Sequence, residues 1–240
     1  MQPRILLIRL SSLGDIILTM PLIAALRQKY PEARIDLIVK KEFVKLAQFF
    51  PGLTLVIGLD TKKDILAKKV EELSATGYTH VLDLHNNFRS TKLHTIKDAT
   101  VTIINKRSFK RWLLVKFKIN LLKKEPDVIG RYFETAAGLG VSDTGSAPLF
   151  DISLKKKNGV AAICPGAKHW NKRWPVEHFQ EAAKSLLTLG YRIEFHGSAD
   201  ERALADEIAT ALPIGSFKNK CGEVELHELP EIFAEIELAI

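Results

Sequence analysis

The chain has 240 residues, of which 46% are hydrophobic and 26% charged, a composition that is typical of a folded globular protein and excludes a disordered or fibrous one. Its two cysteines, Cys164 and Cys221, lie far apart, which excludes a disulfide framework and a CxxC metal or redox site and fits a reducing cytosol. The net charge of +7 favours a polyanionic partner, whether nucleic acid, an anionic membrane or a phosphorylated glycolipid.

In the first half of the chain, apolar runs rich in β-branched residues alternate with segments of helical period. The runs predict strands at 4–10, 34–39, 53–59, 80–84 and 101–105, and the periodic segments predict helices at 21–30, 43–50, 64–74 and 129–139. Arg9 interrupts the first run and no small-residue cleavage site follows, so this run predicts a strand and not a secretory signal. Nowhere do 18 apolar residues run together, so we expect no membrane-spanning segment.

A Ser-, Gly-, Pro- and Lys-rich stretch at 141–159 is the best linker candidate, and a second alternating series follows it. That series predicts strands at 159–164 and 191–197, helices at 176–189, 199–211 and 226–234, and the start of a strand at 237–240. Strands that alternate with helices imply βαβ units and parallel sheets. We therefore expect an α/β protein of two Rossmann-like domains, 1–147 and 148–240, whose sheets face each other across a cleft. Such sheets bind ligands beyond the carboxyl ends of their strands.

The first polar segment at such a strand end is Leu-Ser-Ser-Leu-Gly-Asp at 10–15. Gly14 permits a tight turn from strand to helix, and a carboxylate at Asp15 would stand at the mouth of the cleft as a general base. Alternatively, Ser12 or Asp15 only caps the next helix. Pro21 sits poorly inside a long helix, which predicts a cap nearer Thr19 and weakens the capping alternative for Ser12 and Asp15.

The second segment, Asp83 to Ser90, gathers Asp, His, Asn and Arg after the strand at 80–84. This cluster is polar enough to recognise a sugar or a carboxylate, although any single member could be a turn residue. We count His85, Asn86 and Arg89 as candidate ligand-binding residues, together with Ser12 and Gly14.

The third segment, Cys164 to Pro175, follows the first strand of the second series and carries Lys168, Lys172 and Arg173. Cations and backbone N–H groups at a helix start suit a diphosphate, and they would offset charge growing on a leaving nucleotide. The alternative is a solvated basic loop whose tryptophans pack on the core. After the next strand, Ser198 and Glu201 suit a ribose or phosphate contact, but a capping box explains them nearly as well.

The stretch from 106 to 124 holds eight basic residues and no acidic one: Lys106, Arg107, Lys110, Arg111, Lys116, Lys118, Lys123 and Lys124. Its apolar residues partly share a helical face, which suits docking at an anionic membrane or a lipid-linked acceptor. Alternatively, the helix covers the domain core with its lysines outward. No metal-ligand pattern, P-loop or Gly-x-Ser-x-Gly motif is present, and no nucleic-acid motif accompanies the charge.

The opening ILLIRLSSLGDIILTMPLIAALRQKYPEARIDLIV resembles that of glycosyltransferase family 9, the ADP-heptose:lipopolysaccharide heptosyltransferases. VLDLHNNFRS, VIGRYFETAAGLG, PGAKHWNKRWPVEHF and FHGSADE resemble later landmarks of that family in the right order. The resemblance covers essentially the whole chain, and SSLGD and KRWP are its more specific parts.

This resemblance implies a GT-B architecture, with the acceptor bound by the first domain and the nucleotide sugar by the second. It implies inverting transfer of heptose from ADP-heptose to the inner core of lipopolysaccharide, without a cofactor or metal, at the cytoplasmic face of the inner membrane. Asp15 matches the family's proposed base, Lys172 matches a lysine at the donor phosphate, and Glu201 matches an acidic residue near the ribose. Gly166, Lys168, Arg173 and Ser198 complete the expected donor contacts, and Lys106, Arg107, Lys110 and Arg111 the expected acceptor contacts.

One departure concerns the end of the sequence. Family members continue from the strand that begins at Glu237 into an Asp-Thr-Gly-Pro-x-His motif, which does not follow Ile240 here. We therefore expect an incomplete second domain. A relative that binds nucleotide or lipid without turnover, and a transferase for another nucleotide sugar, stand as alternative functions.

Overall fold

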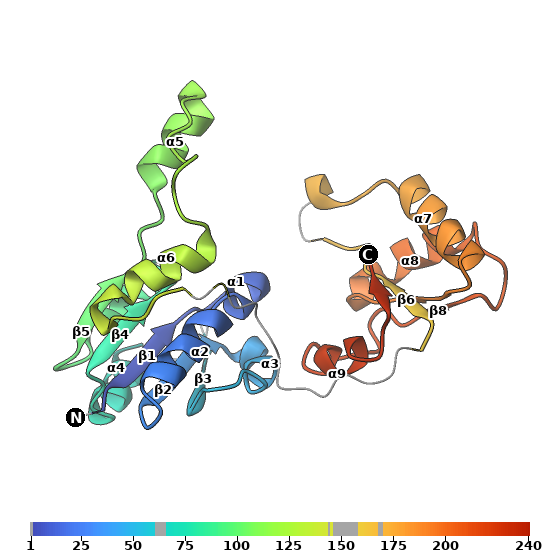
Figure 1. Cartoon of the computed structure of the whole chain (residues 1–240). Helices are drawn as coiled ribbons and strands as arrows, with labels where there is room; N and C mark the ends of the chain where they lie inside the picture. Colours follow the sequence, from blue (N-terminus) through green and yellow to red (C-terminus); the bar gives the residue numbers. More distant parts are fainter. Residues whose placement is uncertain (1, 61–65, 144, 146–157, 168–169) are drawn as a thin grey trace. The chain divides into compact units, whose positions relative to one another are not determined.

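The computed structural model describes residues 2–60, 66–143, 145, 158–167 and 170–240. The chain divides into two compact units, Met1–Asp151 and Ile152–Ile240 (Figure 1). Most of the predicted linker at 141–159 lies outside the described residues. Within the described ranges, no helix has the length and apolar character needed to cross a bilayer.

The first unit is built on a parallel sheet of five strands in the order β3-β2-β1-β4-β5. The strands are β1 (Arg4–Ile8), β2 (Arg34–Lys40), β3 (Leu55–Leu59), β4 (His80–Asp83) and β5 (Thr100–Ile103). Because helices cover both faces, the side chains of β1 from Ile5 to Ile8 are all fully buried, which explains its continuous apolar run. The strand order reverses between β1 and β4, so the loops that leave these two strands flank the switch point where such sheets bind ligands.

Helices α2 (Met20–Lys29) and α6 (Val128–Thr135) pack together on one face of this sheet, and α4 (Leu66–Ala75) and the 3-10 helix η2 (Thr91–Thr95) pack on the other (Figure 1). Thr19 is the N-cap of α2 and Pro21 stands in its first turn, which confirms the predicted cap. The remaining elements are α1 (Leu13–Ile17), η1 (Lys41–Phe43), α3 (Val44–Ala47), α5 (Ser108–Phe117) and η3 (Ala137–Leu139).

The second unit carries a parallel sheet in the order β8-β7-β6-β9. Its strands are β6 (Val160–Ile163), β7 (Arg192–Phe195), β8 (Phe217–Asn219) and β9 (Leu238–Ala239). Its helices are η4 (Trp170–Lys172), α7 (Val176–Thr188), η5 (Ala199–Glu201), α8 (Arg202–Ala209) and α9 (Leu229–Phe233). Helices α7 and α8 share one apolar cluster with Ile193 and Phe195 of β7. The ring of Phe233 in α9 lies 5.5 Å from that of His196, whose side chain faces the other side of the sheet because side chains alternate along a strand.

Helix α5 does not cover the core, so that interpretation of the basic stretch is wrong. All ten of its residues are described and none is buried. In Figure 1 the helix projects away from the sheet of its own unit. Its apolar side chains are thus unused by the fold of the first unit.

Candidate functional site

Asp15 lies in the first turn of α1, directly beyond the carboxyl end of β1. Its carboxylate forms an ion pair with the Arg9 guanidinium and accepts a hydrogen bond of 2.9 Å from Oγ of Ser12. The Tyr132 hydroxyl, from α6, donates to the backbone carbonyl of Asp15 at 3.1 Å. The Asp15 side chain keeps 31% of its surface exposed. Ser12 occupies the N-cap position of α1 without a side-chain cap bond, so its hydroxyl serves the carboxylate and not the helix.

Arg9 is the residue that holds this arrangement together. Its side chain is 12% exposed, donates to the backbone carbonyl of Leu84 and lies 5.8 Å from the ring centroid of Tyr132. Burial raises the pKa of Asp15, but the Arg9 charge and the Ser12 hydrogen bond outweigh it and leave that pKa below its ordinary value. Asp15 is therefore ionised at neutral pH, the form in which it accepts a proton.

The loop after β4 is organised by the buried carboxylate of Asp83. One of its oxygens accepts the backbone N–H groups of His85 and Asn86, each at 2.8 Å, and the other lies 2.8 Å from Nε2 of His94. Asn86 has a φ of +49° and donates from its side chain to the carbonyl of Ile104 at 3.1 Å. Asp83 and Asn86 thus shape the turn, in agreement with the alternative reading of these polar residues.

The same turn places the imidazole ring of His85 near Arg9 and Lys106. Burial, aided by the nearby charges of Arg9 and Lys106, lowers the pKa of His85 to about 4. His85 is therefore neutral at pH 7, and it stands among cations that favour an anionic ligand. Arg89, by contrast, is exposed, and its backbone N–H donates to the Asn87 side chain at 3.0 Å.

The four predicted basic acceptor contacts differ in their surroundings. Burial lowers the pKa of Lys106, and the Arg9 charge adds to that effect. Arg107 and Lys110 both form ion pairs with Glu125, and Arg107 also pairs with Glu134 at 2.8 Å. Arg111 is exposed and lines a cavity of about 230 Å³ near the base of α5. Lys106 is therefore the cation of this group that the structure brings next to Arg9, whereas Arg107 and Lys110 face carboxylates.

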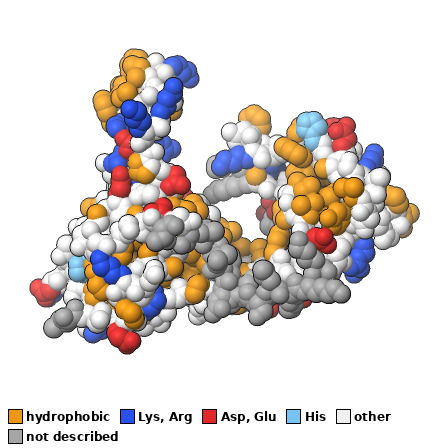
Figure 2. Space-filling model, viewed as in Figure 1, with side chains coloured by type: hydrophobic (Ala, Val, Ile, Leu, Met, Phe, Trp, Pro, Cys, Tyr) orange, Lys and Arg blue, Asp and Glu red, His pale blue; other side chains and the backbone are white. Residues whose placement is uncertain are grey.

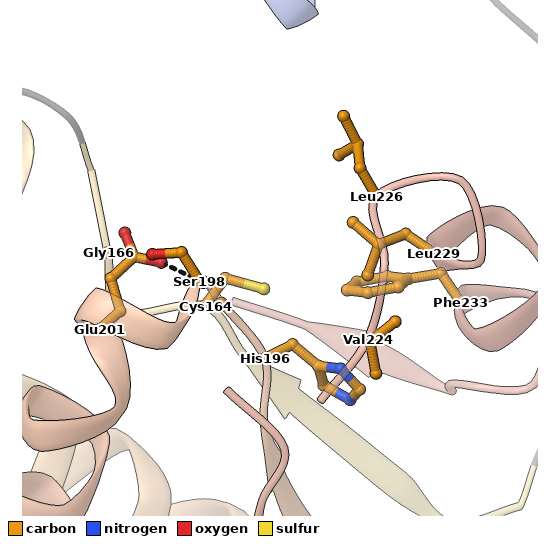
Figure 3. A pocket seen from close by; sticks show the side chains of 10 residues that line it. Cys164, Gly166, His196, Ser198, Glu201, Val224, Leu226, Leu229 and Phe233 are labelled. Atoms are coloured by element: carbon orange, nitrogen blue, oxygen red, sulfur yellow. Dashed lines mark hydrogen bonds between the residues drawn. The ribbon is translucent and has the colours of Figure 1, made fainter. Parts of the chain in front are cut away.

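The second unit contains a pocket of about 330 Å³ where β6 and β7 end (Figure 3). Its polar side carries Ser198 and Glu201, and its other side is apolar, as Figure 3 shows. The lining residues are Cys164, Gly166, His196, Gly197, Ser198, Glu201, Val224, Leu226, Leu229 and Phe233. Three predicted donor contacts, Gly166, Ser198 and Glu201, therefore line one pocket.

Glu201 joins the loops that follow β6 and β7. Its carboxylate accepts the backbone N–H of Ser198 at 2.7 Å, which is the contact expected from helix capping. The same carboxylate lies so close to Gly166 and Gly197 that an added Cβ would come within 1.7 Å and 2.6 Å of its oxygens. A side chain at either position would therefore displace the Glu201 carboxylate, which contacts the helix start and lines the pocket.

In the basic loop between β6 and α7, residues 170–175 are exposed. Lys172 ends η4, and Arg173 donates from Nε to the carbonyl of Ala167 at 2.7 Å. Lys168 lies outside the described residues. Trp174 is 53% exposed although its ring lies 5.5 Å from that of the buried Phe179, and Trp170 is 84% exposed, so neither tryptophan is a core residue.

Sequence reasoning missed several residues that complete these sites. Arg9 was noted only as an interruption, although a charged residue at the end of a buried strand is a signal of a site. Tyr132 lies in an amphipathic helix that was predicted from the sequence, but nothing in the helical pattern distinguishes it from a core residue. His196 was quoted as part of a motif, and the apolar wall from Val224 to Phe233 has no motif at all. Among the described residues, no cluster of His, Cys, Asp or Glu has the arrangement of a metal site.

Comparison with known proteins relates this geometry to one family. The model of glycosyltransferase family 9 (heptosyltransferase) matches residues 66–240. Lipopolysaccharide heptosyltransferase 2 of Escherichia coli strain K12 is 24% identical to this chain over an alignment of 253 residues, gaps included. The alignment covers 94% of this chain and 73% of that protein.

Solved structures give the same relationship at the level of the fold. The structure of E. coli ADP-heptose lps heptosyltransferase II matches with a TM-score of 0.79 at 24% identity, and it covers 98% of this chain and 78% of that one. E. coli heptosyltransferase WaaC with ADP-2-deoxy-2-fluoro heptose matches with a TM-score of 0.77 at 19% identity over 98% of this chain and 81% of that one. These matches confirm the predicted GT-B-like α/β architecture with parallel sheets.

Proposed function

Because this chain belongs to glycosyltransferase family 9 and is a glycosyltransferase, we propose that it transfers heptose from ADP-heptose to the inner core of lipopolysaccharide, with inversion at the anomeric carbon. The observation that carries the proposal is the pocket at the ends of β6 and β7, with Glu201 on one side and an apolar wall on the other. A nucleotide has the same two-sided character, with hydroxyl and phosphate groups at one end and a flat base at the other.

The donor is assigned to the second unit. The volume of about 330 Å³ falls in the range of small-ligand pockets. We place the base against Leu226, Leu229 and Phe233 and the ribose hydroxyls near Glu201, which accepts hydrogen bonds. Lys168, Lys172 and Arg173, in the loop after β6, would then reach the diphosphate. The choice of adenine follows the ADP-heptose and the ADP-2-deoxy-2-fluoro heptose named for the two structural relatives.

The acceptor and the chemistry are assigned to the first unit. Asp15 takes the proton of an acceptor hydroxyl as that oxygen attacks the anomeric carbon, and the bond from this carbon to the diphosphate breaks. The products are a heptosylated acceptor, ADP and a proton, so the step balances without a metal or redox partner. Cations near the diphosphate offset the charge that develops on the leaving ADP.

The acceptor's anionic groups would meet Lys106 and Arg111, beside the neutral His85 ring, with Ser12 and Gly14 lining the approach to Asp15. Such an acceptor is lipid-linked, so we place the protein at the cytoplasmic face of the inner membrane, in peripheral contact with it. Nucleic acid has no part in this function.

The test is transfer by this chain from ADP-heptose to a heptose-free lipopolysaccharide core, followed by mass spectrometry of the acceptor. We expect an acceptor heavier by one heptose and stoichiometric ADP. Transfer from UDP-sugars or GDP-sugars in place of ADP-heptose would instead identify another donor. Binding of ADP without any product would support the alternative of a non-catalytic relative.

A further inference from the structure

The residues from 108 to 124, called the α5 arm below, concentrate exposed apolar side chains on one projecting segment. Figure 2 shows hydrophobic side chains and Lys and Arg side chains side by side on it. Six large apolar residues of the arm are each at least 47% exposed: Phe109, Trp112, Val115, Phe117, Ile119 and Leu121. An apolar surface this dense on a protruding segment is a feature of contact sites.

The aromatic residues of the arm pack on one another and not on the body of the unit. The rings of Phe109 and Trp112 stack with centroids 5.9 Å apart, and Phe117 meets Trp112 edge-on at 5.2 Å. The ammonium of Lys116 lies 5.6 Å from the Trp112 centroid. A tryptophan with an adjacent lysine suits the boundary between lipid headgroups and acyl chains, because an apolar ring and a cation are solvated there together.

The charge of the arm has two separate uses. At its base, Lys110 pairs with Glu125, and the preceding Arg107 pairs with Glu125 and with Glu134 of α6, which ties the base of the arm to α6. The other bases of the arm are exposed: Arg111, Lys116, Lys118, Lys123 and Lys124. The arm contains no acidic residue, so these bases are not neutralised within it. An apolar surface surrounded by cations alone complements an anionic bilayer.

We propose that the α5 arm is a membrane-docking element that inserts Trp112 and its aromatic neighbours into the interface of an anionic bilayer. The inference deepens the proposed function and rests on it for the choice of a lipid surface over a protein partner. It assigns the membrane contact to the same unit that holds Asp15. A lipid-linked acceptor would then be met by a unit already held at the surface in which that acceptor lies.

The test is co-sedimentation of the full chain with vesicles of phosphatidylglycerol and phosphatidylethanolamine, compared with vesicles of phosphatidylcholine. We expect binding to the anionic vesicles that weakens with added salt, since exposed charges are screened. The double variants Trp112→Ser/Phe117→Ser and Lys116→Glu/Lys118→Glu should each lower the partition coefficient by about tenfold or more. All four positions are exposed, so these changes leave the fold intact.

Matched controls come from the second unit. Ile214→Ser removes an apolar residue that is fully exposed, and Lys184→Glu reverses an exposed charge on α7. Both should bind vesicles like the unchanged chain. In addition, Trp170→Phe/Trp174→Phe leaves Trp112 as the sole tryptophan. Its emission should shift to shorter wavelength with anionic vesicles and be quenched by brominated lipids.

Two results would overturn the proposal. One is equal vesicle binding by the α5-arm variants and the unchanged chain; the other is a Trp112 emission spectrum that does not change when vesicles are added. A chain that self-associates through the arm, so that Trp112→Ser/Phe117→Ser converts a dimer to a monomer without any vesicle binding, would also overturn it. Failure of the proposed function looks different, because vesicle binding would persist while ADP-heptose is not used. Conversely, with both ideas correct, the arm variants lose transfer to vesicle-embedded acceptor but keep transfer to a deacylated one.

Discussion

The Glu201 carboxylate occupies the space that a side chain at position 166 would need: a Cβ added to Gly166 would lie 1.7 Å from Oε1 of Glu201. Gly166 follows β6 and Glu201 follows β7, so this close approach brings together two loops at the carboxyl edge of the second sheet. The pocket is lined by both residues, and its shape therefore depends on their contact.

Gly166→Ala should weaken ADP binding by about tenfold or more, because the new methyl group displaces the carboxylate from the pocket wall and leaves the backbone N–H of Ser198 without its acceptor. Isothermal titration calorimetry with ADP measures the effect. Gly138→Ala is the matched control, since a Cβ there meets nothing within 4 Å. Equal ADP affinity in both variants would show that the carboxylate has no part in nucleotide binding.

The sequence was sufficient to predict the elements that have a strong period. The parallel strands, the position of the cap at Thr19 and most helices were predicted from apolar runs and spacing. Strand β8 was missed because Phe217–Asn219 has only three residues, two of them polar, and its partner is β7, at a distance in the chain. Pairing of this kind is a tertiary property that a local pattern does not carry.

Only part of each site was predicted, because contacts between side chains far apart in the chain are also a tertiary property. Asp15, Gly166 and Glu201 follow strands, and the rule that ligands bind beyond carboxyl ends identified their segments. That Arg9 pairs with Asp15, and that Arg107 and Lys110 pair with Glu125, depends on where side chains meet in space. A run of basic residues therefore looked uniform in the sequence, whereas the structure divides it into an anchored base and an exposed arm.

Asp15→Asn should lower the rate constant kcat for heptose transfer by about a hundredfold or more, because an amide does not accept the acceptor's proton. The hydrogen-bonding shape of the side chain is kept, so ADP affinity should stay unchanged. Steady-state transfer assays and ADP calorimetry on the same preparation measure both. Glu42→Gln, at an exposed carboxylate, serves as the control. A normal rate in Asp15→Asn would remove this residue from the mechanism.

Arg9→Gln should move the acid limb of the pH profile of kcat/KM to higher pH. In the unchanged chain the Arg9 charge outweighs burial and lowers the pKa of Asp15, so the carboxylate stays ionised as the pH falls. Without Arg9 the raising effect of burial is opposed by Ser12 alone, and Asp15 takes up its proton at a higher pH. The pH dependence of kcat/KM measures the shift. Arg4→Gln, at an exposed arginine that begins β1, should leave the limb in place, and an unmoved limb in Arg9→Gln would contradict the coupling.

Lys172→Ala should raise the KM for ADP-heptose and leave acceptor kinetics nearly unchanged. Lys172 is exposed at the end of η4, in the loop that follows β6, so its removal disturbs no core packing. A hydrogen bond between a lysine and a phosphate contributes about 1.5–3 kcal/mol, which corresponds to a loss of about tenfold to a hundredfold in donor binding. Donor titrations at saturating acceptor measure this loss, with Lys184→Ala as the matched exposed lysine on α7. Because a positive charge is what the diphosphate requires, Lys172→Arg should recover most of the affinity. Equal donor KM values for Lys172→Ala and Lys184→Ala would assign the diphosphate to other groups of the loop.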